Sequence, residues 1–450
     1  MRNVILSQKV KKVHIVGVSG VSTSGIAEYL IQKGFSVSGS DLVKRQNVCR
    51  LIEKGLKFFN NHAAANVKGA DLVIYSAAIS DNNPEIKYAK NKNIPLVKRS
   101  VILGEIALDF ANSVAVSGSH GKTTTTAMIA AILTAAKKSP TVFLGGEDSL
   151  SNGYTEGNSD YAVLEACEYK KNMLDVKTKY AVVLNVDNDH LDSYGNMNEM
   201  VKAFNEFVDG CSIAVVNADD KYTNKLYCPA SVNFGIDSPA VYTAKNLKKG
   251  ENGYSFTAYA YSLPLGRINL KVIGRHNVYN ALAAIAVADL LGVRFGYIKS
   301  ALENFCSVKR RAEYLGKTNG IKCFADYAHH PKELFATLTA FKENYQNIGV
   351  VFQPHTYSRT KLLMADFVEA LKDYQTVIYK TYAAREDFDF DGSAKKLCDE
   401  LKDKNANCHY ADNQEELNQK LKNLSGIDII LFLGAGDIYE IALKVIAAKE

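Results

Sequence analysis

The chain has 450 residues, more than one ordinary hydrophobic core accommodates, so its length predicts two to four domains. Hydrophobic residues make up 47% and charged residues 23% of the sequence, a balance typical of soluble globular proteins. The net charge of +6 comes from lysines and arginines scattered through every segment, which argues against nucleic-acid binding. Because no apolar run approaches about 18 residues and the N-terminus lacks a signal-peptide core, we expect a cytoplasmic protein without membrane insertion.

The cysteines support the same expectation. They form no Cys-x-x-Cys pair and no metal-binding spacing, so we predict reduced and mostly buried thiols. The eight positions are 49, 167, 211, 228, 306, 323, 398 and 408.

The N-terminal third alternates short apolar strands with helices, as dinucleotide-binding folds do. Its first strand, at residues 13–18, enters a glycine-rich loop, and its second, at 35–39, precedes an acidic residue where such folds hold a ribose. The glycines do not satisfy the Gly-x-Gly-x-x-Gly spacing, so the pattern predicts a Rossmann-like domain that holds some diphosphate. A strand at 70–75 runs into small residues, which either leave room for a ligand or simply end the strand. The candidate ligand residues are Gly17, Ser19, Gly20, Ser40, Asp41, Ser76, Ala77 and Ala78.

The most informative motif is a phosphate-binding loop in the middle of the chain. A β-type run from Val114 leads to Gly118-Ser119-His120-Gly121-Lys122-Thr123-Thr124, and an Ala/Ile-rich helix follows. The glycines let backbone N–H groups approach an anion, and the helix N-terminus adds partial positive charge. We expect Lys122 to reach the β/γ-phosphates and Thr123 to offer its hydroxyl to Mg²⁺. The loop is a short Gly-x-x-Gly-Lys-Thr variant, and it predicts nucleotide binding.

Two further strands of this region end in polar residues. Glu165 ends the strand at 161–165, and Asp187, Asp189 and His190 follow the strand at 180–184. Aspartates in such positions often only cap helices, but carboxylates and an imidazole beside a phosphate loop suit Mg²⁺ held against ATP. We therefore predict a metal site at these strand ends.

Farther along, Asn277 and Asn280 lie on one face of the first turn of an apolar helix. They are either helix caps or contacts to a base or ribose.

After a charged junction at 307–313, the C-terminal third again alternates strands with helices, which predicts another α/β domain. Strands at 321–325 and 348–352 are followed by polar clusters, at the carboxyl ends where such sheets bind ligands. The clusters contain Tyr327, His329, His355 and Arg359, and we expect them to grip a carboxylate, with the arginine forming a bidentate pair.

In this order, the motifs resemble those of the Mur ligase family, from Gly17 to Asp437. The motifs are Gly118-Ser-His-Gly-Lys-Thr-Thr, Glu165-Ala-Cys-Glu-Tyr, Asp189-His-Leu-Asp, Gly274-Arg-His-Asn-Val-Tyr-Asn, Val308-Lys-Arg-Arg, Asp326-Tyr-Ala-His-His-Pro, Gln353-Pro-His-Thr-Tyr-Ser-Arg-Thr and Gly434-Ala-Gly-Asp. The resemblance implies an α/β protein of three domains: a Rossmann-like UDP-sugar domain (1–110), a central P-loop ATPase-type domain with a parallel sheet (111–309), and a Rossmann-like amino-acid domain (310–450). 

The resemblance also implies an activity. It is the ATP-dependent ligation of L-alanine to the lactoyl carboxylate of UDP-N-acetylmuramate through an acyl phosphate, a step of peptidoglycan synthesis. The implied cofactors are ATP and Mg²⁺, and the implied partners are small molecules only. We expect the protein to be a monomer or a weak homodimer.

The resemblance assigns roles residue by residue. It implies catalytic roles for Lys122, His190, His329 and Arg359, and metal binding by Thr123, Glu165 and His190. It implies nucleotide contacts by residues 118–124 and by His276, Asn277, Asn280, Arg311 and Asp326, and a carboxylate and alanine site at Tyr327, His329, His355 and Arg359. Two departures are Ser119, where threonine is usual, and Ala325, where an aspartate often stands.

Three other interpretations remain open from the sequence. A recycling ligase of the same family joins a tripeptide to the same sugar, although the Ser-Gly-Ile-Ala segment at 24–27 favours the alanine enzyme. An ATPase switch without ligase activity leaves the C-terminal polar clusters unexplained. An NAD oxidoreductase is disfavoured by the glycine spacing.

Overall fold

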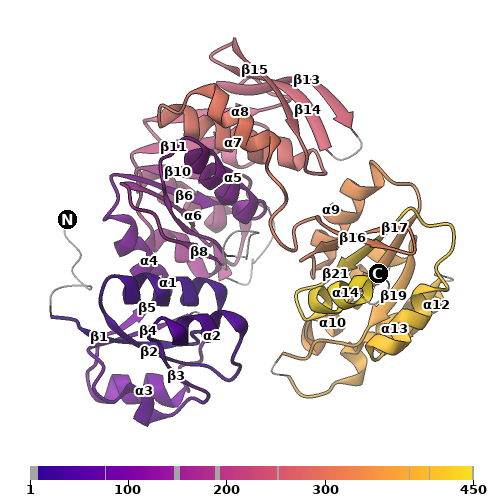
Figure 1. Cartoon of the computed structure of the whole chain (residues 1–450), viewed down its shortest axis with the longest axis horizontal. Helices are drawn as coiled ribbons and strands as arrows, with labels where there is room; N and C mark the ends of the chain where they lie inside the picture. The colour runs from indigo at the N-terminus through magenta and orange to yellow at the C-terminus, as the bar shows by residue number, and fades with distance from the viewer. Residues whose placement is uncertain are drawn as a thin grey trace. The chain divides into compact units, whose positions relative to one another are not determined.

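The computed structural model describes residues 9–76, 78–145, 153–187, 193–250, 253–384, 386–404 and 406–447. The chain forms two compact units. The first holds the described residues up to Lys249 together with Ser255–Leu270 and His276–Phe305, and the second holds Gly250–Tyr254, Lys271–Arg275 and the chain from Cys306. Figure 1 shows the helices and strands of both units, with the second mainly in orange and yellow.

The N-terminal part of the first unit is a parallel sheet of five strands in the order β3-β2-β1-β4-β5. From β1 the chain passes to β2 and β3 on one side and then to β4 and β5 on the other, so the strand order reverses between β1 and β4. The carboxyl ends of these two strands are the position where doubly wound sheets bind ligands. The elements are β1 (Lys12–Val16), α1 (Val21–Gln32), β2 (Ser36–Ser40), α2 (Gln46–Glu53), β3 (Lys57–Phe59), η1 (Ala64–Val67), β4 (Leu72–Tyr75), α3 (Pro84–Asn91), β5 (Leu96–Lys98) and α4 (Arg99–Ala107).

The larger sheet of the first unit has the order β15-β14-β13-β12-β11-β10-β6-β9-β7-β8 among the described residues. β6 pairs in parallel with both β9 and β10, so the three strand ends that carry the predicted nucleotide and metal residues lie on one edge. On this sheet α5 packs against α7 and α8. The elements are β6 (Asn112–Ser117), α5 (Lys122–Ala135), β7 (Thr141–Phe143), β8 (Tyr154–Thr155), β9 (Tyr161–Glu165), η2 (Tyr169–Asp175), β10 (Tyr180–Val183), α6 (Met197–Asp209), β11 (Ile213–Asn217), η4 (Thr223–Lys225), β12 (Ser231–Gly235), β13 (Tyr242–Gly250), β14 (Gly253–Ala260), β15 (Leu263–Leu270), α7 (His276–Leu290) and α8 (Phe295–Glu303).

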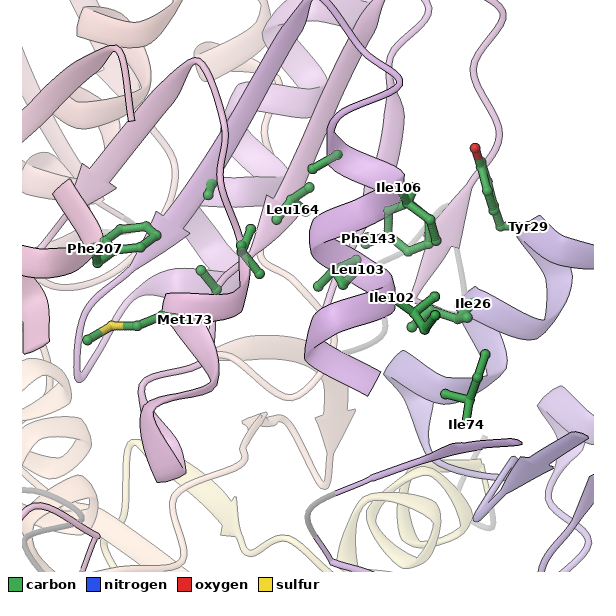
Figure 2. Close-up of a cluster of buried hydrophobic side chains, with 14 of the residues drawn as sticks. Ile26, Tyr29, Ile74, Ile102, Leu103, Ile106, Phe143, Leu164, Met173 and Phe207 are labelled. Carbon is green, nitrogen blue, oxygen red and sulfur yellow. The ribbon is translucent and has the colours of Figure 1, made fainter. Parts of the chain in front are cut away.

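A single buried cluster joins the two sheets of the first unit. Figure 2 shows apolar side chains of α1 and α4, among them Ile26, Ile102 and Ile106, in the same cluster as Leu164 of β9 and Phe207 of α6. These side chains are 0–2% exposed, so their burial contributes to holding the sheets together.

The second unit is built on a sheet with the order β16-β17-β21-β18-β19-β20, parallel except for the β16–β17 pair. Successive residues of β18 face opposite sides, because Val350 and Phe352 belong to one core cluster and Val351 to another. The elements are β16 (Glu313–Thr318), β17 (Ile321–Asp326), α9 (Pro331–Lys342), β18 (Ile348–Phe352), α10 (Tyr357–Leu362), α11 (Met364–Leu371), β19 (Gln375–Tyr379), η5 (Phe390–Gly392), α12 (Ala394–Asp403), β20 (Cys408–Ala411), α13 (Gln414–Leu421), β21 (Ile429–Leu433) and α14 (Ile438–Ala447).

The prediction of an α/β protein with three mainly parallel sheets is confirmed. All eight cysteines are free thiols, although four of them, Cys49, Cys167, Cys211 and Cys306, are not buried. No helix in the described part of the chain is long and apolar enough to cross a membrane.

Candidate active site

The predicted phosphate-binding loop lies between β6 and α5, as the motif requires. Gly118 and Gly121 have φ angles of 138° and 86°, in the region that favours glycine. The side chain of Asn185, just after β10, accepts a hydrogen bond from the His120 N–H at 2.8 Å and donates one to the His120 carbonyl at 3.0 Å. The neighbouring strand therefore fixes the shape of the loop.

Lys122 is held at the start of α5 by an ion pair and by its own loop. Its Nζ donates to the carbonyls of Gly118 at 2.6 Å and Ser119 at 3.1 Å, and it lies 2.9 Å from Oε2 of Glu168. Burial lowers the pKa of Lys122, but Glu168, Cys167 and Glu165 together outweigh this effect and the pKa is raised. Lys122 therefore carries an ammonium charge at the loop, ready for an anionic ligand.

Glu168 was not among the predicted site residues. Its carboxylate is only 2% exposed, so its contact with Lys122 is a buried charge pair. The sequence signal for it was the second glutamate of Glu165-Ala-Cys-Glu168, three residues past the end of β9.

Two of the three predicted metal ligands lie on the same edge of the sheet. Glu165 ends β9 in register with Val116 of β6, and its Oε1 accepts the Gly145 N–H at 2.6 Å. Thr123 is in the first turn of α5, and it is 7% exposed. A carboxylate and a hydroxyl are hard oxygen donors, which fit Mg²⁺.

The third predicted ligand, His190, lies outside the described residues, as do Asp189 and Asp192 of its motif. Within the described ranges, no group of three or more His, Cys, Asp or Glu residues forms a metal site by itself. A Mg²⁺ ion that completes its coordination with waters and phosphate oxygens needs only a few protein ligands.

The amides of α7 lie against the phosphate loop. Asn280 donates to Oδ1 of Asn277 at 2.9 Å, and Asn277 contacts Nε2 of His276 at 3.1 Å. A Cβ atom added to Gly121 would lie 2.5 Å from Oδ1 of Asn280, so the glycine makes room for this amide. The two asparagines are inside the helix rather than at its cap, and the fold brings them together with the loop.

In the N-terminal sheet, the predicted ligand residues of β1 and β2 are joined by hydrogen bonds. The N–H groups of Gly17 and Val18 donate to the Ser40 carbonyl at 2.8 and 3.1 Å. The Ser19 N–H donates to Oδ2 of Asp41 at 3.1 Å. These loop N–H groups are therefore engaged within the protein, which fixes the shape of the loop.

The residues that follow β4 lie next to the same glycine loop. A Cβ atom on Gly17 would lie 3.2 Å from Cδ1 of Ile79 and 3.9 Å from Oγ of Ser76. Ala78 is exposed, and Ala77 lies outside the described residues. The structure thus brings Ser76 to the glycine loop, as predicted.

Sequence reasoning missed Arg99 at this end of the sheet. Its guanidinium donates to Oγ of Ser22, in the first turn of α1, at 2.5 Å. The cation therefore lies at a helix N-terminus that also favours anions. The pattern gave no hint, because Arg99 stands in the chain next to several surface lysines.

The C-terminal cluster unites residues from three strand ends of the second unit. The rings of Tyr327 and His329 are 5.2 Å apart, those of His329 and His355 are 5.8 Å apart, and Tyr382 stacks on His355 at 5.4 Å. Nδ1 of His355 and Nη1 of Arg359 are buried and have no hydrogen-bond partner among the described residues. Buried polar atoms without partners indicate a place where a ligand binds. Tyr382 was not predicted, because it follows β19 in a segment without a motif.

The backbone before Arg359 is strained and held from two sides. Thr356, a β-branched residue, has a φ angle of 69°, and its N–H donates to the Tyr382 carbonyl at 2.9 Å. The Ser358 N–H, in the first turn of α10, donates to Glu386 at 2.9 Å. Such strain persists only where the surroundings fix it, so the start of the helix that carries Arg359 is fixed in place.

The remaining predicted nucleotide residues of this unit also lie together. Oδ2 of Asp326 accepts the Ala312 N–H at 2.8 Å, and Oδ1 accepts the Ala328 N–H at 2.9 Å. The guanidinium of Arg311 lies over the Tyr327 ring, 5.3 Å from its centre. Burial raises the pKa of Asp326 in spite of the opposing charge of Arg311. Asp326 therefore anchors the two segments that carry Arg311 and Tyr327.

The free energy of unfolding is expected to fall as the pH drops from 6.5 towards 4. Burial, together with His329 and Arg359, lowers the pKa of His355 from 6.5 to about 4. In this window the unfolded chain binds a proton that folded His355 does not, so acid favours unfolding. The loss of unfolding free energy due to His355 is complete only below about pH 4, where the folded imidazole is protonated as well. Thermal unfolding of the wild type and of His355→Gln across this range measures the effect. The variant should show a shallower dependence on pH, and an unchanged slope would contradict the assignment.

Comparisons with known proteins identify the family of the chain. Three family models match: "Mur ligase family, catalytic domain" at residues 12–111, "Mur ligase middle domain" at 116–288 and "Mur ligase, glutamate ligase domain" at 310–436. The UDP-N-acetylmuramate–L-alanine ligase of Acetivibrio thermocellus is 40% identical over 98% of this chain and 97% of its own. The enzyme of that name from Aquifex aeolicus is 40% identical over 96% and 97%.

Solved structures give the same result. The UDP-N-acetylmuramate–alanine ligase of Thermotoga maritima matches with a TM-score of 0.82 and 31% identity, over 97% of this chain and 98% of that one. A murein peptide ligase of Psychrobacter arcticus matches with a TM-score of 0.71 at 21% identity, over 97% and 98%, which shows a shared fold. By sequence, by motif and by structure, the chain belongs to the Mur ligase family.

Proposed function

We propose that the protein joins L-alanine to the lactoyl carboxylate of UDP-N-acetylmuramate and converts ATP to ADP and phosphate. The observation that carries the proposal is the presence of two different sites in one chain. One is a phosphate loop with a largely buried ammonium, at Lys122, and the other is a cluster in which Nδ1 of His355 and Nη1 of Arg359 are buried without hydrogen-bond partners among the described residues. A plain ATPase needs only the first. The relatives that share about 40% identity are named for this ligation.

The first chemical step is phosphoryl transfer. A carboxylate oxygen of the sugar attacks the γ-phosphorus of ATP, the bond to the β-phosphate oxygen breaks, and ADP leaves with the acyl phosphate left behind. Lys122 neutralises charge on the transferred group, and Asn277 and Asn280 hold the nucleotide beside the loop. Mg²⁺ held by Thr123, Glu165 and His190 would screen the phosphate oxygens.

The second step forms the amide. The alanine nitrogen attacks the acyl carbon, phosphate leaves from the tetrahedral intermediate, and the nitrogen loses a proton. Arg359 stabilises the carboxylate or the oxyanion with its planar donors. Burial lowers the pKa of His329, so its imidazole is neutral at pH 7 and is able to accept that proton.

The N-terminal sheet holds the UDP part of the sugar nucleotide in this proposal. Ser76 and Asp41 flank the glycine loop, and Arg99 with Ser22 offers cationic and hydroxyl donors to the diphosphate. The proposed domains are residues 1–110 for the UDP-sugar, 111–309 for ATP and 310–450 for the amino acid. Because ATP drives the ligation, we place the reaction in the cytoplasm.

A substrate comparison tests the proposal. The protein is incubated with ATP, Mg²⁺ and UDP-N-acetylmuramate, with either L-alanine or L-alanyl-γ-D-glutamyl-meso-diaminopimelate as acceptor. Mass spectrometry should show the alanine conjugate and one phosphate released per amide formed. Ligation of the tripeptide alone would support the recycling enzyme, and phosphate release without any conjugate would support an ATPase.

A further inference from the structure

A buried carboxylate lies behind the glycine loop of the N-terminal sheet. Glu85, in the first turn of α3, is 0% exposed. Its Oε2 accepts a hydrogen bond from Oγ of Ser40 at 2.6 Å and lies 2.9 Å from Nδ1 of His62. Its Oε1 accepts from Nδ2 of Asn66 at 2.7 Å and lies 3.5 Å from Nε2 of His14. Both carboxylate oxygens are thus surrounded by polar groups from different segments.

Glu85 is ionised despite its burial. Burial raises the pKa of a carboxyl group, but the hydrogen bonds from His14, Ser40, Asn66 and His62 hold the pKa of Glu85 at about 2. Desolvating an ion is costly, and a well-packed apolar side chain often stabilises a fold as well as a buried charge does. The stability of the sheet therefore does not by itself explain a charge at this position.

The contacts of Ser40 connect this charge to the ligand loop. Ser40 is the last residue of β2, and its hydroxyl donates to Glu85 while its carbonyl accepts the N–H groups of Gly17 and Val18. The next residue, Asp41, accepts the Ser19 N–H. Glu85 thus fixes the end of β2, whose residues Ser40 and Asp41 accept hydrogen bonds from the first three N–H groups of the loop.

We propose that Glu85 is a positioning residue for the nucleotide part of the UDP-sugar. Its carboxylate holds Ser40, and through it Asp41 and the glycine loop, in the shape that receives the uridine diphosphate. The inference rests on the proposed function, because it takes the N-terminal sheet to be the UDP-binding site. It assigns no contact between Glu85 and the substrate.

Glu85→Gln tests the inference, with Glu28→Gln as a matched control. Glu28 is a second buried carboxylate of the same sheet domain, 6% exposed in its side chain, and it pairs with Arg50 at 2.7 Å and Lys54 at 2.6 Å, away from Ser40. Isothermal titration gives the Kd for UDP, UDP-N-acetylmuramate and ATP, and thermal unfolding gives Tm. Glu85→Gln should weaken binding of UDP and of the sugar nucleotide about tenfold, the scale of a lost charged hydrogen bond, and leave the Kd for ATP unchanged. Glu28→Gln should lower Tm without weakening the binding of UDP.

Steady-state kinetics separates positioning from a general loss of structure. Glu85→Gln should raise KM for the sugar nucleotide and leave kcat at saturation unchanged. If Glu85→Gln does not fold, Ser40→Ala removes the same link and should raise the same KM.

The outcomes are distinct. Wild-type affinity for UDP in Glu85→Gln, or an equal loss in Glu28→Gln, would overturn the inference while the proposed function stands. A wild-type protein that binds neither UDP nor UDP-N-acetylmuramate would overturn the proposed function and this inference with it.

Discussion

Replacing Lys122 by alanine is expected to lower the rate of ligation by at least about 100-fold, the scale of losing one preorganised charge contact. Lys122 lies at the N-terminus of α5, where its ammonium is fixed by two loop carbonyls and by Glu168. Phosphoryl transfer spreads negative charge over the γ-phosphate oxygens, and a cation fixed in the loop that holds these oxygens stabilises that charge. Phosphate-release kinetics measures the loss, and circular dichroism checks that the secondary structure is retained.

The same substitution removes the ammonium that lies beside the buried Glu168 carboxylate, so part of any effect would come from lost stability. The double variant Lys122→Ala/Glu168→Gln separates the two contributions. Removing the charge of Glu168 should restore Tm towards the wild-type value, but it should not restore turnover. Turnover near the wild-type rate in Lys122→Ala would remove this loop from the active site.

The sequence predicted the fold best where a strand is apolar throughout. β9 at Tyr161–Glu165 and β18 at Ile348–Phe352 were predicted with these bounds, because buried parallel strands read as unbroken apolar runs. β16 at Glu313–Thr318 was not predicted, and only its first residue falls in the predicted charged junction at 307–313. It is an antiparallel edge strand, and such strands carry polar residues that hide their pattern.

Contacts between segments that are distant in the chain could not be predicted from a single sequence. The face that α4 presents to η2 depends on Gly104, where a Cβ atom would overlap the Asp175 carbonyl oxygen. Nothing in the local pattern of α4 distinguishes this glycine from one that merely weakens a helix. The shared core of Figure 2 therefore had to be seen in the structure.

The residues of the candidate site fall into the same two groups. Lys122 and Glu165 were predicted because each belongs to a local pattern of strand, loop and helix. The other residues contact partners that are far away in the chain. Glu168 pairs with Lys122, Arg99 donates to Ser22, and Tyr382 stacks on His355. Contacts between residues so far apart in the chain depend on the order of the strands in the sheet, and local motifs do not determine that order.

Arg359→Lys is expected to lower kcat/KM for amide formation by about 10- to 100-fold, with a much smaller effect on the Kd for ATP. Nη1 of Arg359 is buried without a hydrogen-bond partner among the described residues, although the helix that carries it is fixed at its start. A lysine keeps the charge but presents a single point of contact, so it loses the planar pair of donors that matches a carboxylate. The loss should therefore fall on the step that handles the carboxylate and not on the nucleotide.

Arg310→Lys is the matched control for this prediction. The guanidinium of Arg310 already bonds both carboxylate oxygens of Glu440, at 2.9 and 3.0 Å, and Glu440 is well exposed. Surface pairs of this kind contribute little, so Arg310→Lys should ligate alanine at the wild-type rate. Titration with ATP and mass spectrometry of the conjugate distinguish the two variants. Normal ligation by Arg359→Lys would place the carboxylate site elsewhere, and equal losses of ATP binding and ligation would make Arg359 a nucleotide ligand instead.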